Sequence, residues 1–465
     1  MTHSDLAPKV WPALEFSLGS KRVCWGLSLV NKIRHLIVLM MENRSFDHYL
    51  GSLTLEGRTD VNGLPTPLPA IPDQNGNPVA SRSIDNLPPR YPDPPHSWDA
   101  SHSDYNAGLN DGFVLQYQLQ HPTADPSIPM GYYTRSTLPV YYALADRFTV
   151  CDAWFSSVLS STWPNRKYLN SGRRDEDKDT HALPPFPGFM TTPFYEVLEN
   201  SPNPDLLGSN LTWKCYFSDL PFLGFWYRFT AEHAIHSFKS VDDFVIDCIE
   251  ERLPTVSIID PPFSLADDHP SHAPQLGQKF AGLIVDALTT SKSWETSALL
   301  LLYDENGGFF DHVSPPQAFE EPVEDNPLGF RVPALVVSPY AKKGFACHTV
   351  LDHTSVIKSI NERWGVEFGL EFGTRWKQAP GIWDCCFDFD QEPIERGIYT
   401  GDPLLNINWG TRVHDLLTIE ANPLEGMLER IFILPELKAL DQRAQVFETL
   451  TSLEQRVISL KRMMM

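Results

Sequence analysis

Two adjacent acidic residues, Asp304 and Glu305, directly follow the continuous apolar run 297–303 and precede a pair of glycines. An apolar run of this length is typical of a strand buried on both faces of a parallel sheet. In α/β proteins ligands bind outside the carboxyl ends of such strands. Buried carboxylates are costly there unless a cation or hydrogen bonds compensate them. The pair is therefore a candidate cation site, although an ordinary solvated turn has the same local pattern.

A second acidic motif has the same arrangement near the N-terminus. Glu42 and Asn43 directly follow the apolar run 36–41. If both runs lie in one parallel sheet, Glu42, Asn43, Asp304 and Glu305 meet at the same edge. Three carboxylates and one amide form an oxygen-rich site that suits a divalent cation.

Three residues with hydroxyl side chains, Ser160, Ser161 and Thr162, lie shortly before Pro164. Proline favours the first turn of a helix, and hydroxyl residues favour the position before it. A hydroxyl at a helix N-terminus lies in a positive field that stabilises an alkoxide or a bound phosphate. Plain N-capping explains the same pattern, and a hydroxyl is a weak nucleophile without a metal or a base. The acidic residues described above would supply that metal.

Several histidines lie in predicted loops, where they would either act on a substrate or hold the loop in place. A single loop histidine is more often a surface group than a catalytic one. A catalytic role is easier to support for His269. It lies in a loop after a predicted core strand, directly between Asp268 and a proline. The other candidates are His96, His272, His312 and His353.

Four short apolar runs must position these residues. They span residues 36–41, 256–259, 297–303 and 334–337, and each ends at a polar side chain. As buried strands they predict an α/β fold with a large central, mostly parallel sheet flanked by helices. The chain has 40 prolines in 465 residues, and they are densest between positions 64 and 95, where ten of them lie. This segment predicts irregular insertions rather than a second folded unit.

Composition excludes some partners and a membrane span. The net charge of −22 disfavours nucleic acid and anionic membrane surfaces as non-specific partners. No window approaches the apolar length of a transmembrane helix, and the short stretch 23–30 lacks the h-region and cleavage site of a signal peptide. We therefore expect cytoplasmic synthesis, although leaderless export or injection into a host would leave the same sequence.

The seven cysteines do not follow the pattern of a secreted disulfide framework, because their number is odd and they are scattered between Cys24 and Cys386. Only Cys385 and Cys386 are adjacent. We interpret this vicinal pair as reduced and structural rather than as a metal clip.

Five motifs together resemble the phosphoesterase family, whose members include bacterial phosphatidylcholine-type phospholipases C, plant non-specific phospholipases C and an acid phosphatase that inhibits the respiratory burst. One motif would be a weak signal, whereas five in order with comparable spacing are highly specific. The resemblance implies an alkaline-phosphatase-like α/β fold, in agreement with the buried strands. The motifs span residues 41–51, 95–98, 161–166, 268–272 and 303–313.

The resemblance assigns a role to each matched residue. Glu42 and Asn43 correspond to the first pair of metal-site residues, and Asp304 and Glu305 correspond to the second pair. Thr162 corresponds to the hydroxyl nucleophile at the metal, which is Ser in the acid phosphatase branch and Thr in the phospholipase branch.

The remaining candidate residues fall into two groups. His96 and His269 correspond to active-site histidines that hold phosphate oxygens or move the proton of the leaving group. A second tier of candidates has no firm role and comprises Asp268, His272, His312 and His353.

The resemblance implies a metal-dependent phospholipase C that hydrolyses phosphatidylcholine and related phospholipids at a membrane surface. The products would be diacylglycerol and a phosphorylated head group, formed through a phospho-threonine at Thr162. One or more divalent metals, zinc or calcium, would activate the hydroxyl and polarise the phosphoryl oxygen. The alternative enzyme is an acid phosphatase with the same site. The intact site residues disfavour a non-catalytic binding or assembly protein on this scaffold.

Two regions are expected along the chain. Residues 1–375 form the predicted catalytic domain, and residues 376–465 form a C-terminal extension. The extension is predicted to end in an amphipathic helix, which either packs on the chain's own body or joins two copies in a homo-oligomer. Its apolar residues follow heptad spacing at Val446, Leu450, Leu453, Val457 and Leu460.

Overall fold

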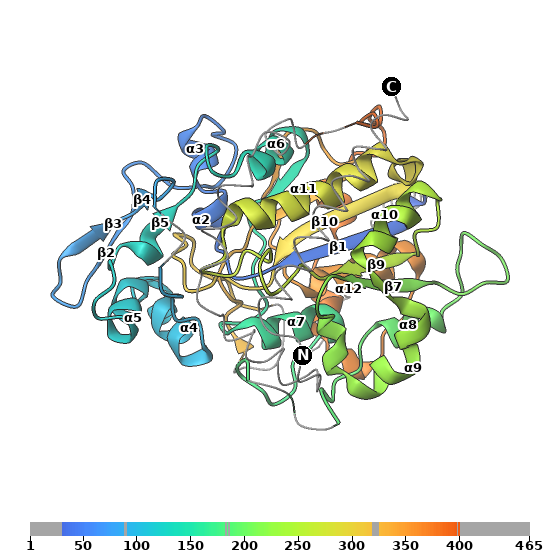
Figure 1. Ribbon diagram of the computed structural model, residues 1–465, viewed down its shortest axis with the longest axis horizontal. Coiled ribbons are helices and arrows are strands. Elements are labelled where there is room, and N and C mark those ends of the chain that lie inside the picture. Colours follow the sequence, from blue (N-terminus) through green and yellow to red (C-terminus); the bar gives the residue numbers. More distant parts are fainter. Residues whose placement is uncertain are drawn as a thin grey trace, which may run out of the picture.

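An eight-stranded sheet crosses the centre of the computed structural model, which describes residues 30–87, 91–181, 184, 187–318, 325–397 and 399 (Figure 1). The strand order is β12-β6-β11-β10-β1-β9-β7-β8. All pairings are parallel except the two made by β11, so the predicted mostly parallel α/β architecture is confirmed. The strands are β1 (His35–Met41), β6 (Thr149–Cys151), β7 (Trp213–Phe217), β8 (Phe238–Ser240), β9 (Val256–Ile259), β10 (Ser297–Tyr303), β11 (Ala334–Val337) and β12 (Phe345–Cys347).

The four strands expected from apolar runs all belong to this sheet. β9, β10 and β11 have the predicted bounds, and β1 begins one residue earlier, at His35. Every residue of β10 is buried, as expected for a strand covered on both faces. β11 runs against its neighbours, so its end at Ser338 lies at the opposite edge, where the Ser338 hydroxyl donates to the carbonyl of Ser297 at 2.9 Å.

Helices cover both faces of the sheet (Figure 1). On one face α11 packs against α6 and α10, and on the other α12 packs against α7, α13 and α14. Further helices flank the sheet at its β7 and β8 end or follow β1. The helices are α2 (Phe46–Tyr49), α3 (Ser52–Leu55), α4 (Trp98–Tyr105), α5 (Phe113–Gln120), α6 (Pro139–Arg147), α7 (Thr162–Ser171), α8 (Tyr195–Glu199), α9 (Tyr227–Ser237), α10 (Val241–Ile249), α11 (Pro274–Thr290), α12 (Thr354–Trp364), α13 (Arg375–Gln378) and α14 (Ile382–Cys386).

α7 is the helix predicted from the hydroxyl residues before Pro164. It begins at Thr162, and all 10 of its residues are buried. It ends at Ser171 and is capped by Gly172, whose φ of 68° lies in the left-handed region. A Cβ there would lie 2.4 Å from the carbonyl oxygen of Phe372, so the close approach of this loop also requires glycine.

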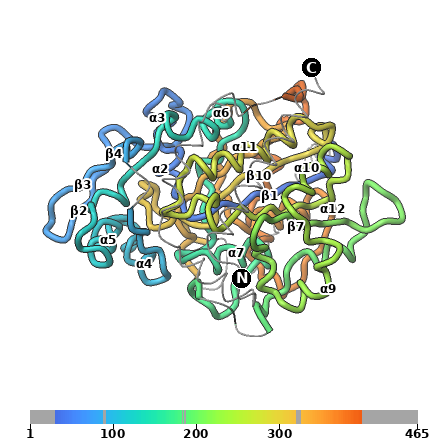
Figure 2. The backbone as a smooth tube through the Cα atoms, in the orientation of Figure 1, coloured from blue at the N-terminus to red at the C-terminus, as the bar shows by residue number. Residues whose placement is uncertain are grey.

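The proline-rich segment belongs to a lobe at the end of the sheet where β1 ends, on the left in Figures 1 and 2. The lobe contains α2 to α5 and two small sheets. In these sheets β2 (Ala70–Pro72) pairs with β3 (Pro78–Ala80), and β4 (Arg82–Ser83) pairs with β5 (Gly131–Tyr132). The described residues of the insertion thus have little regular structure, as predicted.

The chain after α12 continues onto the body of the protein. α13 and α14 pack against α12, and the indole of Trp383 donates to the carbonyl of Ser359 at 2.8 Å. The predicted heptad helix lies outside the described residues, as do residues 1–29, and the domain boundary at residue 375 stays a prediction. Within the described ranges no helix has both the length and the apolar composition needed to cross a membrane.

Candidate active site

The carboxyl ends of β1 and β10 bring the four predicted metal residues together. Parallel pairing places Met41 beside Tyr303, so the residues that follow both strands leave the sheet at the same level. The backbone N–H of Asn43 donates to Asp304 Oδ1 at 2.9 Å. Glu42, Asn43, Asp304 and Glu305 have no exposed surface, which confirms that the two motifs meet in a buried site.

Backbone geometry holds the two loops in contact. Asn43 has a φ of 57°, a left-handed conformation that Asn adopts more readily than most residues. Gly307, with a φ of 62°, packs so closely that a Cβ would lie 2.1 Å from the carbonyl oxygen of Asn43. The N–H of Gly307 donates to Glu305 Oε2 at 2.6 Å. The glycine after the acidic pair therefore allows the loops to meet and orients one carboxylate.

Thr162 faces this acidic cluster. Its hydroxyl lies at the start of α7 and donates to Glu42 Oε2 at 3.3 Å. The neighbouring hydroxyls have other partners, since Ser160 donates to the carbonyl of Lys178 and Ser161 accepts from the N–H of Thr180. The geometry therefore distinguishes Thr162 from both serines.

The acidic cluster contains more oxygen atoms than the protein satisfies. Three of its buried side-chain oxygens have no hydrogen-bond partner among the described residues and no guanidinium beside them, and such atoms are costly without compensation by a cation. Carboxylate and amide oxygens are the donors that hard divalent cations prefer. The residues present therefore fit a divalent metal. The three atoms are Asn43 Oδ1, Asp267 Oδ2 and Glu305 Oε1, whereas Glu42 Oε1 and Asp304 Oδ2 face the guanidinium of Arg166.

Arg166 is a further residue of the cluster, and no role was predicted for it. Its buried guanidinium lies 2.5 Å from Glu42 Oε1 and 3.4 Å from Asp304 Oδ2. It also pairs with Asp260, the residue at the end of β9, at 3.2 Å. Helical spacing could have indicated its position, because Arg166 follows Thr162 by four residues and therefore lies on the same face of α7.

His96 and His269 approach the cluster from two different loops. Their ring centroids lie 5.9 Å apart. The amide of Asn43 contacts His96 Nε2 at 3.1 Å, and Glu305 Oε1 lies 3.9 Å from the same nitrogen. Asp93, which was not predicted, lies 3.9 Å from both rings, and the three side chains form a group that could hold a metal ion.

Electrostatics separate the protonation states of these groups. Burial raises the pKa of Glu42 well above its ordinary value, although the nearby Arg166 opposes the shift. Burial also raises the pKa of Glu305 to about 8. For His96 burial favours the neutral form, but Glu305 and Asp93 outweigh it and raise the pKa to about 9. Burial lowers the pKa of His269, so this ring is neutral at physiological pH. A bound cation would therefore stabilise the ionised form of these buried carboxyl groups.

Two of the second-tier residues, His353 and His272, hold residues of the acidic cluster in place. His353 Nε2 donates to the carbonyl of Asp304 at 2.7 Å, and the indole of Trp154 donates to its other ring nitrogen. His272 Nδ1 lies 2.6 Å from Asp267 Oδ1. Both histidines therefore contact a residue of the cluster and orient it.

The other two second-tier residues are directed elsewhere. Asp268 accepts hydrogen bonds from the hydroxyls of Tyr141 and Tyr303 in the core. The preceding residue, Asp267, instead lies close enough to Glu42 to raise its pKa. The carbonyl of Asp267 accepts the N–H of Glu42 at 2.9 Å. His312 binds Asp47 at 2.7 Å, and its partners include no predicted metal residue.

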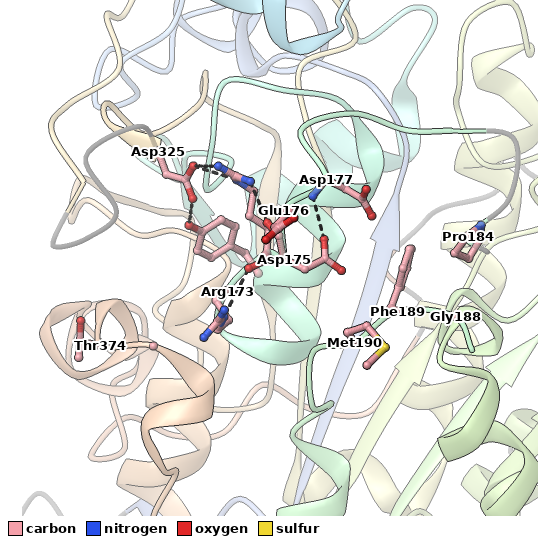
Figure 3. A pocket seen from close by; sticks show the side chains of 13 residues that line it. Arg173, Asp175, Glu176, Asp177, Pro184, Gly188, Phe189, Met190, Asp325 and Thr374 are labelled. Atoms are coloured by element: carbon pink, nitrogen blue, oxygen red, sulfur yellow. Dashed lines mark hydrogen bonds and ion pairs between the residues drawn. The ribbon is translucent and has the colours of Figure 1, made fainter. Parts of the chain in front are cut away.

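A cavity of about 750 Å³ lies near the opposite end of α7 from Thr162 (Figure 3). Its lining includes Tyr168 and Arg174, which both donate to Asp325. None of the predicted catalytic or metal residues lines this cavity. The chemistry predicted from the sequence is therefore located at the sheet edge and not in this cavity.

Comparison with known proteins agrees with this geometry. A model of the Phosphoesterase family matches residues 33–367. The chain belongs to the phosphoesterase family. The mostly parallel eight-stranded sheet agrees with the α/β fold that the resemblance implied. This member of the family is a phosphoric ester hydrolase.

Several relatives cover most of this phosphoesterase. Phospholipase C B of Mycobacterium tuberculosis is 34% identical over 437 residues, which cover 80% of this chain and 81% of the relative. The hemolytic phospholipase C of Pseudomonas aeruginosa is 31% identical over 77% of this chain and 56% of that protein. Non-specific phospholipase C1 of Arabidopsis thaliana is 30% identical over 72% of this chain and 67% of its own.

Solved structures resemble this phosphoesterase only remotely. A lipoteichoic acid synthase of Listeria monocytogenes matches 90% of this chain and 91% of its own, with 12% identity and a TM-score of 0.34. A sulfatase of Pseudoalteromonas sp. matches 81% of this chain and 78% of its own, with 9% identity and a TM-score of 0.34.

Glu305→Gln tests the need of the cluster for a cation. Because burial raises the pKa of Glu305 from 4.5 to about 8, protonation of this carboxyl stabilises the folded state, and that stability is lost as the pH rises through 8. In metal-depleted protein we expect wild type and variant to have the same Tm at about pH 5. At about pH 9 the wild type should melt a few degrees below the variant, and an added divalent cation should reverse that order.

Differential scanning fluorimetry across this pH range measures both effects. Glu232→Gln is the matched control, because Glu232 is exposed on α9 and its substitution should give no such crossing. A metal-depleted wild type that remains more stable than Glu305→Gln at about pH 9 would contradict the cation requirement.

Proposed function

We propose that this phosphoesterase is a metal-dependent phospholipase C that uses Thr162 as its nucleophile. The observation that carries the proposal is the Thr162 hydroxyl, which starts α7 and donates to Glu42 beside the unsatisfied oxygens of the cluster. Relatives named phospholipase C, at 30–34% identity, support a phospholipid diester as the substrate.

The metal would be held by Glu42, Asn43, Asp304 and Glu305, with the Thr162 hydroxyl beside it. When bound, a divalent cation supplies a lower pKa for the hydroxyl and polarises a phosphoryl oxygen. Oxygen donors alone suit calcium or magnesium, whereas the addition of a ligand from His96 would admit zinc.

Glu42 is placed to receive the proton of the nucleophile. Its Oε2 accepts the Thr162 hydroxyl at 3.3 Å, and its other oxygen pairs with Arg166. The Thr162 oxygen would form a bond to phosphorus while the bond from phosphorus to the diacylglycerol oxygen breaks. Water would then hydrolyse the phospho-threonine and release the phosphorylated head group.

His269 is the better placed of the two histidines to protonate the departing diacylglycerol. His96 Nε2 already contacts Asn43 and lies near Glu305, so His96 is engaged with the metal residues. His269 Nε2 instead lies 3.9 Å from Asp93, whose charge partly offsets the burial that lowers the pKa of His269. The neutral ring would therefore take up a proton before it acts as the general acid. A positioned general acid of this kind contributes about 10²–10⁴-fold to the rate.

Substrate and metal dependence test the proposal directly. We expect the protein to release diacylglycerol and phosphocholine from phosphatidylcholine with a higher kcat/KM than it shows for p-nitrophenyl phosphate. Exhaustive chelation should abolish turnover, and adding back zinc, calcium or magnesium one at a time should identify the cation. A preference for the monoester would support the phosphatase alternative, and activity that survives chelation would contradict the metal requirement.

Thr162→Ala should lower kcat by at least about 10³-fold, because it removes the attacking oxygen. Metal binding measured by titration calorimetry should persist through the four other ligands. Ser161→Ala is the matched control, since it removes an adjacent hydroxyl that is directed elsewhere, and it should leave kcat within about twofold. If Thr162→Ala retains turnover while its metal site is intact, Thr162 is not the nucleophile.

His269→Gln should slow phosphatidylcholine hydrolysis by about 10²-fold or more. The same variant should hydrolyse p-nitrophenyl phosphorylcholine almost normally, because p-nitrophenolate leaves without a proton. His312→Gln serves as the control, since His312 binds Asp47 away from the cluster. Equal losses on both substrates would rule out His269 as the general acid.

A further inference from the structure

Four cysteines from distant parts of the chain meet beside the edge of the central sheet. Cys151 ends β6, Cys347 ends β12, and Cys385 and Cys386 lie in α14. The sulfur of Cys386 lies 3.6 Å from that of Cys151 and 3.5 Å from that of Cys385. The sulfurs of Cys151, Cys347 and Cys386 all lie within 4.8 Å of one another, and Cys347 also contacts Cys385.

These distances match a tetrahedral metal site better than a disulfide. A disulfide holds its sulfurs about 2.05 Å apart. Four thiolates at about 2.3 Å from a tetrahedral zinc ion lie about 3.8 Å from one another. The separations of 3.5 and 3.6 Å are close to that edge and far from a covalent bond.

The surroundings of the cluster can compensate negative charge on sulfur. The N–H of Thr349 donates to the Cys347 sulfur two residues earlier. The ammonium of Lys342 donates to the carbonyl of Cys385 at 2.8 Å, at the end of α14. Backbone N–H groups and nearby cations of this kind stabilise metal-bound thiolates. Cys151, Cys347 and Cys386 are buried, which shields such a site from solvent.

We propose that Cys151, Cys347, Cys385 and Cys386 bind one zinc ion that ties α14 to β6 and β12. Each thiol loses its proton to solvent as its sulfur bonds to the metal, so four protons are released and the site carries a charge of −2. Thiolate ligands select zinc over calcium and magnesium, which separates this site from the oxygen-rich cluster. A metal site at Cys385 and Cys386 was not predicted from the sequence, because the other two proposed ligands, Cys151 and Cys347, are remote in the sequence.

Cobalt substitution of the full-length protein tests the proposal. Cobalt(II) bound to thiolates gives an intense near-ultraviolet charge-transfer band, which an oxygen-ligated metal at the cluster of Glu42 and Asp304 cannot produce. We expect this band at about one cobalt per chain in the wild type and in Cys215→Ser, the matched control at another buried cysteine. Cys386→Ser should lose the band and one equivalent of tightly bound zinc.

X-ray absorption of the zinc-loaded wild type keeps the test independent of whether the variant folds. Zinc–sulfur distances of about 2.3 Å are expected. Absence of the thiolate band and of zinc–sulfur scattering in the wild type would overturn the proposal. A disulfide between any two of the four cysteines, found by mass spectrometry of non-reduced peptides, would also overturn it.

Discussion

Buried negative charge at one edge of the sheet is the constraint on which the rest of this structure depends. Glu42, Asp267, Asp304 and Glu305 all lie out of contact with solvent in a small volume. Only one buried guanidinium, that of Arg166, pairs with this group among the described residues. Such a concentration of carboxylates is unfavourable in isolation, and it becomes favourable when a cation completes the site.

The protein holds these carboxylates in place through its backbone rather than through long side chains. The parallel register of β1 and β10 sets the two loops side by side, and Gly307 lets them touch. His353 fixes the loop carbonyl of Asp304, and His272 fixes the carboxylate of Asp267. Both histidines contact the predicted metal residues or their neighbour Asp267, so their observed contacts are structural ones.

Much of the fold followed from local patterns. The apolar run before Asp304 predicted β10 with its observed bounds, since uninterrupted burial leaves a clear signal. The direction of β11 could not be predicted, because an apolar run does not indicate whether a strand is parallel or antiparallel. Contacts between residues that are far apart in the sequence could not be predicted either. Asp93 and Arg166 reach the site from segments whose approach depends on tertiary packing. No role was predicted for Asp267, because the sequence does not indicate which carboxylate of an irregular loop faces inward.

The lobe inserted after β1 supplies Asp93 and His96, whereas the sheet supplies the carboxylates. The two contributions are therefore structurally separable. Insertions, deletions or substitutions in the proline-rich lobe can reshape the approach to phosphorus without altering the strand register that assembles the acidic residues. The architecture thus allows substrate preference to diverge by evolution of a surface segment while the chemical centre is inherited unchanged.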